Sequence, residues 1–199
     1  MELQTIEGAT PLDPDEIEGL LLTHIQTQGE LNQWEQNNIL HAEFWIQRQK
    51  WNTLQILTSD SMRMLHAKMF SDTWGWAGKF RKSNKNIGVD WPMISTELKK
   101  LLDDLETQIT HHSLSYSELA MKFHHRLVSI HPFPNGNGRH ARLATDVLLG
   151  SLNEKNFSWG QKGSVSTLTA STKIRKKYII ALRCADKGDY SKLMDFVNS

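Results

Sequence analysis

The stretch His131–Arg142, read as HPFPNGNGRHAR, constrains most strongly what this chain can fold into. Pro132 and Pro134 each fix a backbone φ angle and lack an N–H donor, so no helix can run through them. Gly136 and Gly138 permit backbone conformations and close approaches to a ligand that a Cβ atom would prevent. We therefore expect one helix to deliver His131 at its end and a second helix to begin after the glycines.

The second helix is predicted by the apolar spacing of Leu143, Ala144, Val147 and Leu148, and Gly150 is expected to end it. The N–H groups of Asn137, Gly138 and Arg139 would lie at its N-terminus, where they and the helix dipole favour an anion. Arg139 and Arg142 are three residues apart and share one helix face. With His131 just upstream, the pattern indicates a phosphate site with a base beside it.

A Pro/Gly-rich connector between two helices is the simpler interpretation of this stretch. The complete string, however, resembles the Fic/Doc (Fido) signature HxFx[D/E]GNGRxxR. The matching residues are His131, Phe133, Gly136, Asn137, Gly138, Arg139 and Arg142. Asn135 stands where the family usually has Asp or Glu.

The resemblance implies an enzyme that transfers AMP from ATP to a Ser, Thr or Tyr hydroxyl of a target protein. It implies that His131 is the general base. Asn137 and the N–H groups of Gly136 and Gly138 would hold the α- and β-phosphates. Arg139 and Arg142 would bind the phosphate tail through planar guanidinium donors, and Phe133 would point into the core.

The departure at Asn135 bears on the metal, because the acidic residue of the family helps to bind Mg²⁺ between the phosphates. An amide oxygen can bind Mg²⁺ but lacks the negative charge that hard cations favour. Two further functions therefore stay open. One is a nucleotide- or protein-binding module without turnover, and the other is a Fic-fold enzyme that transfers a different phosphate-containing group. Gly138 resembles the AMP-transferring members rather than the Doc kinases, which carry Lys there.

The expected fold is all-α, a Fic-type helical bundle with one small β-hairpin. Residues 1–57 are expected to form a helical extension and residues 58–199 the Fic domain. The extension's long helix is expected from Leu31, and a further helix from Thr53 to Phe70. Ser115 and Glu118 have capping-box spacing before the helix that leads to His131. Ile87, Gly88 and Val89 lie in the predicted hairpin, which by the resemblance is a flap that binds the target by strand addition.

Composition and charge give no support for several classes of protein. A net charge of +1 gives no argument for nucleic-acid or membrane binding, and the single Cys184 cannot form an internal disulfide. With no signal-peptide pattern at the N-terminus, we expect a cytoplasmic protein. The segments GATPLDPDE and GELNQWEQNNI, with the motif, resemble a subgroup named mobile mystery protein B. That resemblance implies a small helix-turn-helix regulator or antitoxin as partner.

Regulation is the last expectation. Many Fic proteins are held inactive by a glutamate, within [S/T]xxxE[G/N], that pairs with the second motif arginine. The nearest match here is Glu7-Gly8, with Leu3 where Ser or Thr belongs, and Glu30 is a weaker candidate. We expect the N-terminal arm to fold over the site and Glu7 to meet Arg142. A solvated surface glutamate is the alternative for either residue.

Overall fold

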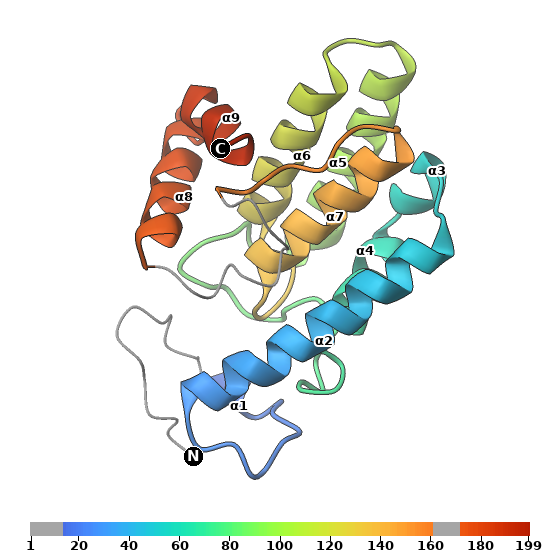
Figure 1. Cartoon of the computed structure of the whole chain (residues 1–199). Coiled ribbons are helices and arrows are strands. Elements are labelled where there is room, and N and C mark those ends of the chain that lie inside the picture. The colour runs from blue at the N-terminus through green and yellow to red at the C-terminus, as the bar shows by residue number, and fades with distance from the viewer. Residues whose placement is uncertain (1–13, 161–171) are drawn as a thin grey trace.

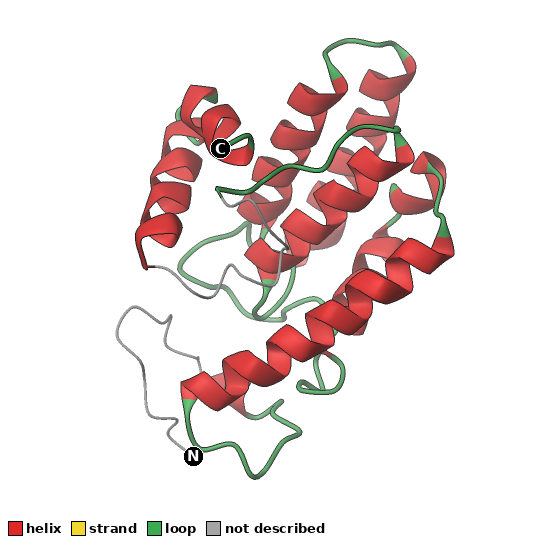
Figure 2. Cartoon of the chain, viewed as in Figure 1, coloured by secondary structure: helices red, strands yellow, loops and turns green. Residues whose placement is uncertain are grey.

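The computed structural model describes residues 14–160 and 172–199, and helices are the regular structure of this part of the chain (Figures 1 and 2). In chain order they are α1 (Pro14–Ile17), α2 (Gln28–Gln49), α3 (Thr53–Ile56), α4 (Ser59–Phe70), the 3₁₀ helix η1 (Trp91–Met93), α5 (Ile94–Thr110), α6 (Tyr116–Ile130), α7 (Asn137–Ser151), α8 (Thr172–Ala185) and α9 (Ser191–Val197). The all-α prediction is confirmed.

Helix α6 lies at the centre of the bundle, packed against α7 on one side and α5 on the other (Figure 1). Helix α2 packs along α4, and α8 packs against α9. One continuous apolar core joins these pairs, with Leu31, Phe70, Phe123 and Leu148 almost fully buried in it. The N-terminal extension therefore packs on α4 through α2 and on the motif helix α7 through α3.

Side-chain caps define the start of several helices. Ser115 and Glu118 form the predicted capping box of α6, in which each side chain bonds to the backbone of the other residue. Thr27 and Glu30 form an equivalent box that starts α2 three residues before the expected Leu31. The helix predicted from Thr53 is divided in two, because Thr58 leaves the helical conformation and caps α4 through Ser61.

The β-hairpin prediction is wrong. Residues 82–90 form an irregular loop, and Pro92 lies in η1 (Figure 2). The backbone groups of this loop form hydrogen bonds outside a hairpin. The Arg81 guanidinium donates to the carbonyl groups of Ser83 and Val89, and the Val89 N–H donates to the Ile130 carbonyl. A hairpin needs these groups for pairing between its own strands. We refer to residues 82–90 as the flap loop.

The position expected for the end of the motif helix also differs. Helix α7 continues through Gly150 to Ser151 and has Leu152 as its C-cap. Gly150 lies within the last turn and its φ is not in the left-handed range. Glycine destabilises a helix less in its last turn than in its centre, so α7 continues through Gly150.

No helix in the described ranges combines the length and the hydropathy needed to cross a membrane. The Glu7 prediction lies outside the described residues.

Candidate active site

The motif loop is held by its own buried groups. Phe133 is fully buried, as predicted, and its ring stacks on His66 with the ring centroids 3.8 Å apart. The Asn137 side chain accepts from the Phe133 N–H at 2.9 Å and donates to the Phe133 carbonyl at 2.8 Å. Both polar groups of this buried amide are therefore used to close the loop. The Asn137 side chain therefore shapes the site from within the loop.

His66 fixes the loop from the side of α4. The Gly78 N–H donates to His66 Nδ1 at 3.0 Å, so the proton of the neutral ring lies on Nε2. Nε2 then donates to the Asn135 carbonyl at 3.0 Å. Complete burial holds the pKa of His66 well below its ordinary value, and the neighbouring His140 and Arg139 add to this effect. The ring stays neutral, as both hydrogen bonds require.

The N-terminus of α7 is the candidate anion site. Gly136 is its N-cap with φ +76°, and a Cβ atom there would lie 2.6 Å from the Phe70 ring. No side chain caps this helix end. The first-turn N–H groups of Asn137, Gly138 and Arg139 are therefore available to an anionic ligand, and the helix dipole favours it.

His131 lies at the C-cap of α6 in the left-handed conformation, with φ +54° and ψ +59°. Burial, together with the smaller effect of the positive charges of Arg81 and Lys85, lowers its pKa to about 4. The imidazole is therefore neutral at pH 7. A neutral imidazole has a nitrogen lone pair that can accept a proton, which a general base needs.

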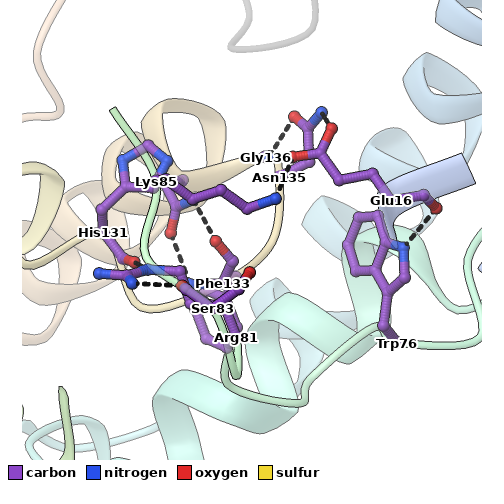
Figure 3. Close-up of polar contacts among 10 residues, drawn as sticks. Glu16, Trp76, Arg81, Ser83, Lys85, His131, Phe133, Asn135 and Gly136 are labelled. Atoms are coloured by element: carbon purple, nitrogen blue, oxygen red, sulfur yellow. Dashed lines mark hydrogen bonds and ion pairs between the residues drawn. The ribbon is translucent and has the colours of Figure 1, made fainter. Parts of the chain in front are cut away.

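Arg81, which the sequence reasoning missed, connects His131 to the flap loop. Its buried guanidinium donates to the His131 carbonyl at 2.7 Å and to the Ser83 carbonyl at 2.7 Å (Figure 3). It also donates to the Val89 carbonyl. Its backbone N–H donates to the Pro132 carbonyl at 3.0 Å. The Arg81 side chain thus fixes the backbone of His131 and also the position of the loop that carries Ile87, Gly88 and Val89.

Arg139 is paired with a glutamate of the N-terminal extension. Its Nη1 lies 2.6 Å from Glu35 Oε2, and the side chain of Glu35 is only 4% exposed. The Trp74 indole N–H donates to the other Glu35 oxygen at 2.7 Å, and the Arg139 guanidinium lies over the Phe70 ring. Glu30, by contrast, is an exposed capping residue of α2.

Arg142 is buried between aromatic rings. Its guanidinium carbon lies 4.3 Å from the centre of the Tyr178 ring and 5.7 Å from that of Trp159. Burial lowers its pKa, an effect that Tyr178 and Asp146 oppose. Burial also raises the pKa of Asp146 to about 7, while the Trp159 indole N–H donates to its carboxyl group. The two motif arginines therefore have different surroundings, one ionic and one aromatic.

Asn135 faces a second glutamate of the extension, Glu16. Its Nδ2 donates to Glu16 Oε2 at 3.2 Å, and its Oδ1 accepts from the Gly136 N–H at 2.5 Å (Figure 3). Lys85 of the flap loop lies 3.5 Å from Glu16 Oε1. The amide therefore turns its N–H₂ group, not its oxygen, toward the carboxylate, and an ammonium group is already there. This arrangement does not fit a protein-bound Mg²⁺ at Asn135, and the described residues contain no cluster of three or more His, Cys, Asp or Glu suited to a metal.

Of the three charged groups that reach the motif, Glu35, Glu16 and Lys85, only Glu35 had a signal in the sequence. Glu35 falls on the apolar face of its helix, one turn from Leu31 and one turn from Ile39, and a carboxylate on a buried face needs a partner. Glu16 and Lys85 had no comparable signal, because each lies in a short or irregular segment whose contacts are all distant in sequence.

The fold and the site together define a helical domain in which an uncapped helix N-terminus lies beside a neutral histidine. Residues 56–149 match the model of the Fic/DOC family, and this part of the chain is a Fic domain. The match begins at the end of α3 and covers α4 to α7, so it contains the whole motif.

Known proteins agree with this assignment. The chain is 28% identical over 126 residues to the protein adenylyltransferase Fic of Aedes aegypti and 29% identical to that of Drosophila melanogaster. The matched part is 60% of this chain, and the chain spans about a fifth (22% and 23%) of the length of these relatives.

Solved structures share the fold. The N-terminal Fic domain of a putative cell filamentation protein from Bartonella quintana, with bound ADP, has a TM-score of 0.65 at 19% identity and covers 88% of this chain and 86% of that one. BepC from Bartonella tribocorum, with bound AMPPNP, has a TM-score of 0.63 at 18% identity, with 87% of each chain covered.

Proposed function

We propose that this protein transfers AMP from ATP to a Ser, Thr or Tyr hydroxyl group of a target protein. The observation that carries the proposal is the position of His131. A neutral imidazole at the end of α6 precedes the uncapped N-terminus of α7, which the loop Pro132–Gly136 turns toward the same site. A base and an anion site are thereby joined by one short, rigid connection.

The reaction follows from these positions. His131 takes the proton of the target hydroxyl, and the hydroxyl oxygen forms a bond to the α-phosphorus of ATP. The bond between that phosphorus and the bridging oxygen breaks, and pyrophosphate leaves with the electron pair. The N–H groups at the start of α7 stabilise the negative charge that develops on the phosphoryl oxygens. Arg139 would bind the phosphate tail once it is released from Glu35, and Arg142 lies one helical turn further along α7.

Support comes from the relatives and neighbours as well as from the geometry. The curated relatives are named protein adenylyltransferases, and two structures of similar fold hold ADP and AMPPNP. We propose ATP as the substrate on this basis. No step is assigned to a Mg²⁺ ion held by Asn135, because that amide offers its N–H₂ group to Glu16. The flap loop 82–90 is the proposed contact with the target, and a helix-turn-helix partner stays a prediction.

The test uses the full-length protein with ATP labelled at the α-phosphate and, separately, at the γ-phosphate. We expect protein-bound label from the α-position alone, and its loss in His131→Ala. ATP binding by calorimetry should be kept in that variant, because the imidazole does not hold the phosphates. Retention of γ-label would identify phosphoryl transfer instead, the third function named above.

A binding module without turnover is the second candidate, and one observation favours it. Both motif arginines are engaged in this structure, Arg139 with the Glu35 carboxylate and Arg142 between Tyr178 and Trp159. Nucleotide binding without any His131-dependent labelling, also after Glu35→Gln, would establish this second function.

A further inference from the structure

A buried ion pair lies beside the motif and is not used in the proposed reaction. Lys85 Nζ and Glu16 Oε1 are 3.5 Å apart, and the two side chains are only 9% and 7% exposed. They come from distant parts of the chain, α1 and the flap loop 82–90. Removing two charges from water costs free energy that their attraction often fails to recover. A contribution to stability therefore does not by itself explain why this pair is present.

The location of the pair gives that explanation. The Glu16 carboxylate also accepts from the amide of Asn135, the motif residue that follows the loop prolines. Figure 3 shows the Lys85 side chain extending from the side of His131 toward the Glu16 carboxylate. The charge of Lys85 reaches the imidazole, since it is one of the causes that lower the pKa of His131. The ammonium group thus lies between the base and the motif loop.

The charge at this place matters because the ligand is an anion. A nucleoside triphosphate brings several negative charges to the N-terminus of α7, and a hard cation or a fixed positive side chain must offset them. Asn135 does not provide a carboxylate for a metal, and its amide oxygen is bonded to the Gly136 N–H. Lys85 is a positive group that the structure places next to this amide.

We propose that Lys85 binds the phosphate groups of the nucleotide in place of a metal ion held by residue 135, and that Glu16 is its counter-ion when no nucleotide is bound. This inference rests on the proposed function and names a further binding residue for it. In the nucleotide complex the Lys85 ammonium leaves the Glu16 carboxylate for a phosphate oxygen. Glu16 and the nucleotide then compete for one cation.

The experiment measures ATP binding to the full-length protein by calorimetry, once with Mg²⁺ and once with EDTA. We expect binding to persist in EDTA. Lys85→Gln should weaken it about tenfold or more, the usual effect of losing a hydrogen bond to a charged group. Lys85→Arg should restore most of the affinity. Lys82→Gln is the matched control, because Lys82 is an exposed lysine of the same loop, and it should bind as the wild type does.

Two further variants keep the result unambiguous. Glu16→Gln should strengthen ATP binding in EDTA, because the competing carboxylate is gone. The double variant Glu16→Gln/Lys85→Gln removes both buried charges together, so it should fold even if Lys85→Gln alone does not, and it should still bind ATP weakly.

The opposite results would overturn the inference. If wild-type binding requires Mg²⁺ and Glu16→Gln abolishes this Mg²⁺-dependent binding, Glu16 is a metal ligand and Lys85 does not replace the metal. Equal affinities of Lys85→Gln and wild type in EDTA would also reject it. Failure of the wild type to bind any nucleotide, with or without Mg²⁺, would instead reject the proposed function itself.

Discussion

The carboxylate of Glu35, in the middle of α2, lies 2.6 Å from the guanidinium of Arg139, in the first turn of α7. The contact joins the N-terminal extension to the proposed phosphate site. Because the carboxylate is nearly buried and also accepts from Trp74, it holds Arg139 in one fixed position. A phosphate tail that binds at α7 must therefore replace this carboxylate.

Glu35→Gln is expected to raise both ATP affinity and protein labelling. The amide keeps the size of the side chain but removes the charge that competes for Arg139. The gain should be about tenfold, from the loss of one charge-assisted hydrogen bond. The thermal midpoint should fall at the same time, because the partly buried guanidinium loses its partner. Labelling with α-labelled ATP and a melting curve measure the two effects.

Glu30→Gln is the matched control for that variant. Glu30 is on the same helix and is exposed, and glutamine also serves in a capping box. Its labelling should equal that of the wild type. If both variants gain activity, or neither does, the Glu35–Arg139 pair does not restrain the site. The pairing of Glu7 with Arg142 is a separate prediction that Glu7→Gly tests.

The motif and the helices were predictable because their signals are local. Proline and glycine spacing located the loop, apolar spacing located α7, and Ser115 with Glu118 located the start of α6. The partners of the motif were not predictable in the same way. Glu16, Glu35 and Lys85 reach it from segments far away in sequence, and which of several glutamates does so depends on how α1 and α2 pack.

The flap loop shows why the hairpin prediction failed. Its Asn, Gly and Val content matches a turn between short strands, and that pattern is real. The competing interaction is the guanidinium of Arg81, which bonds to carbonyl groups at both ends of the loop. The buried side chain of Arg81 thus determines the backbone conformation of the flap loop. The apolar and polar periodicity of the sequence does not reveal such a contact.

Gly88→Ala is expected to disturb the flap loop and to lower labelling strongly. Gly88 has φ +114°, and a Cβ atom there would lie 2.6 Å from Arg81 Nη2 and 2.8 Å from His131 Cβ. Both the backbone angle and the contacts disfavour alanine, at a cost of about 1–3 kcal/mol. Because the clash falls on the group that holds His131, turnover should fall more than ATP affinity. Single-turnover labelling and calorimetry separate these quantities.

Gly150→Ala provides the contrast. Gly150 lies inside α7, its φ is outside the left-handed range, and no atom lies within 4 Å of a Cβ built there. Alanine should therefore stabilise the helix by about 0.5–1 kcal/mol and leave labelling unchanged. Destabilisation by this change would show that α7 ends before Gly150.

Acidification is expected to destabilise the protein between about pH 6.5 and 4. Burial lowers the pKa of His124 to about 3 and that of His140 to about 4, while an unfolded chain binds these protons near the ordinary value. The unfolded state thus binds more protons in this range. Stability falls as the pH falls, by about 1.4 kcal/mol per pH unit for each group. Denaturant titrations at several pH values measure the slope.

Asp146 changes the pH dependence of stability in the opposite direction to the buried histidines. Its pKa is raised to about 7 in the folded state, so folded Asp146 keeps its proton at pH values where the unfolded chain has released it. The stability that this proton contributes is lost as the pH rises toward 7. Asp146→Asn should therefore steepen the loss of stability on acidification. A stability that does not change from pH 7 to pH 5 in both forms would contradict neutral, buried histidines.

Asn135→Asp is expected to make nucleotide binding dependent on Mg²⁺. The change removes the N–H₂ group that donates to Glu16 and leaves two carboxylates about 3 Å apart. Two like charges at that distance bind a proton or a cation together, and paired carboxylates are the oxygen ligands that Mg²⁺ favours. ATP affinity with Mg²⁺, relative to EDTA, should thus rise well above the wild-type ratio. The melting temperature of the variant should also rise with added Mg²⁺ alone, since a ligand that binds the folded state stabilises it. If Mg²⁺ tightens binding equally in both proteins and shifts neither melting curve, residue 135 does not control the metal.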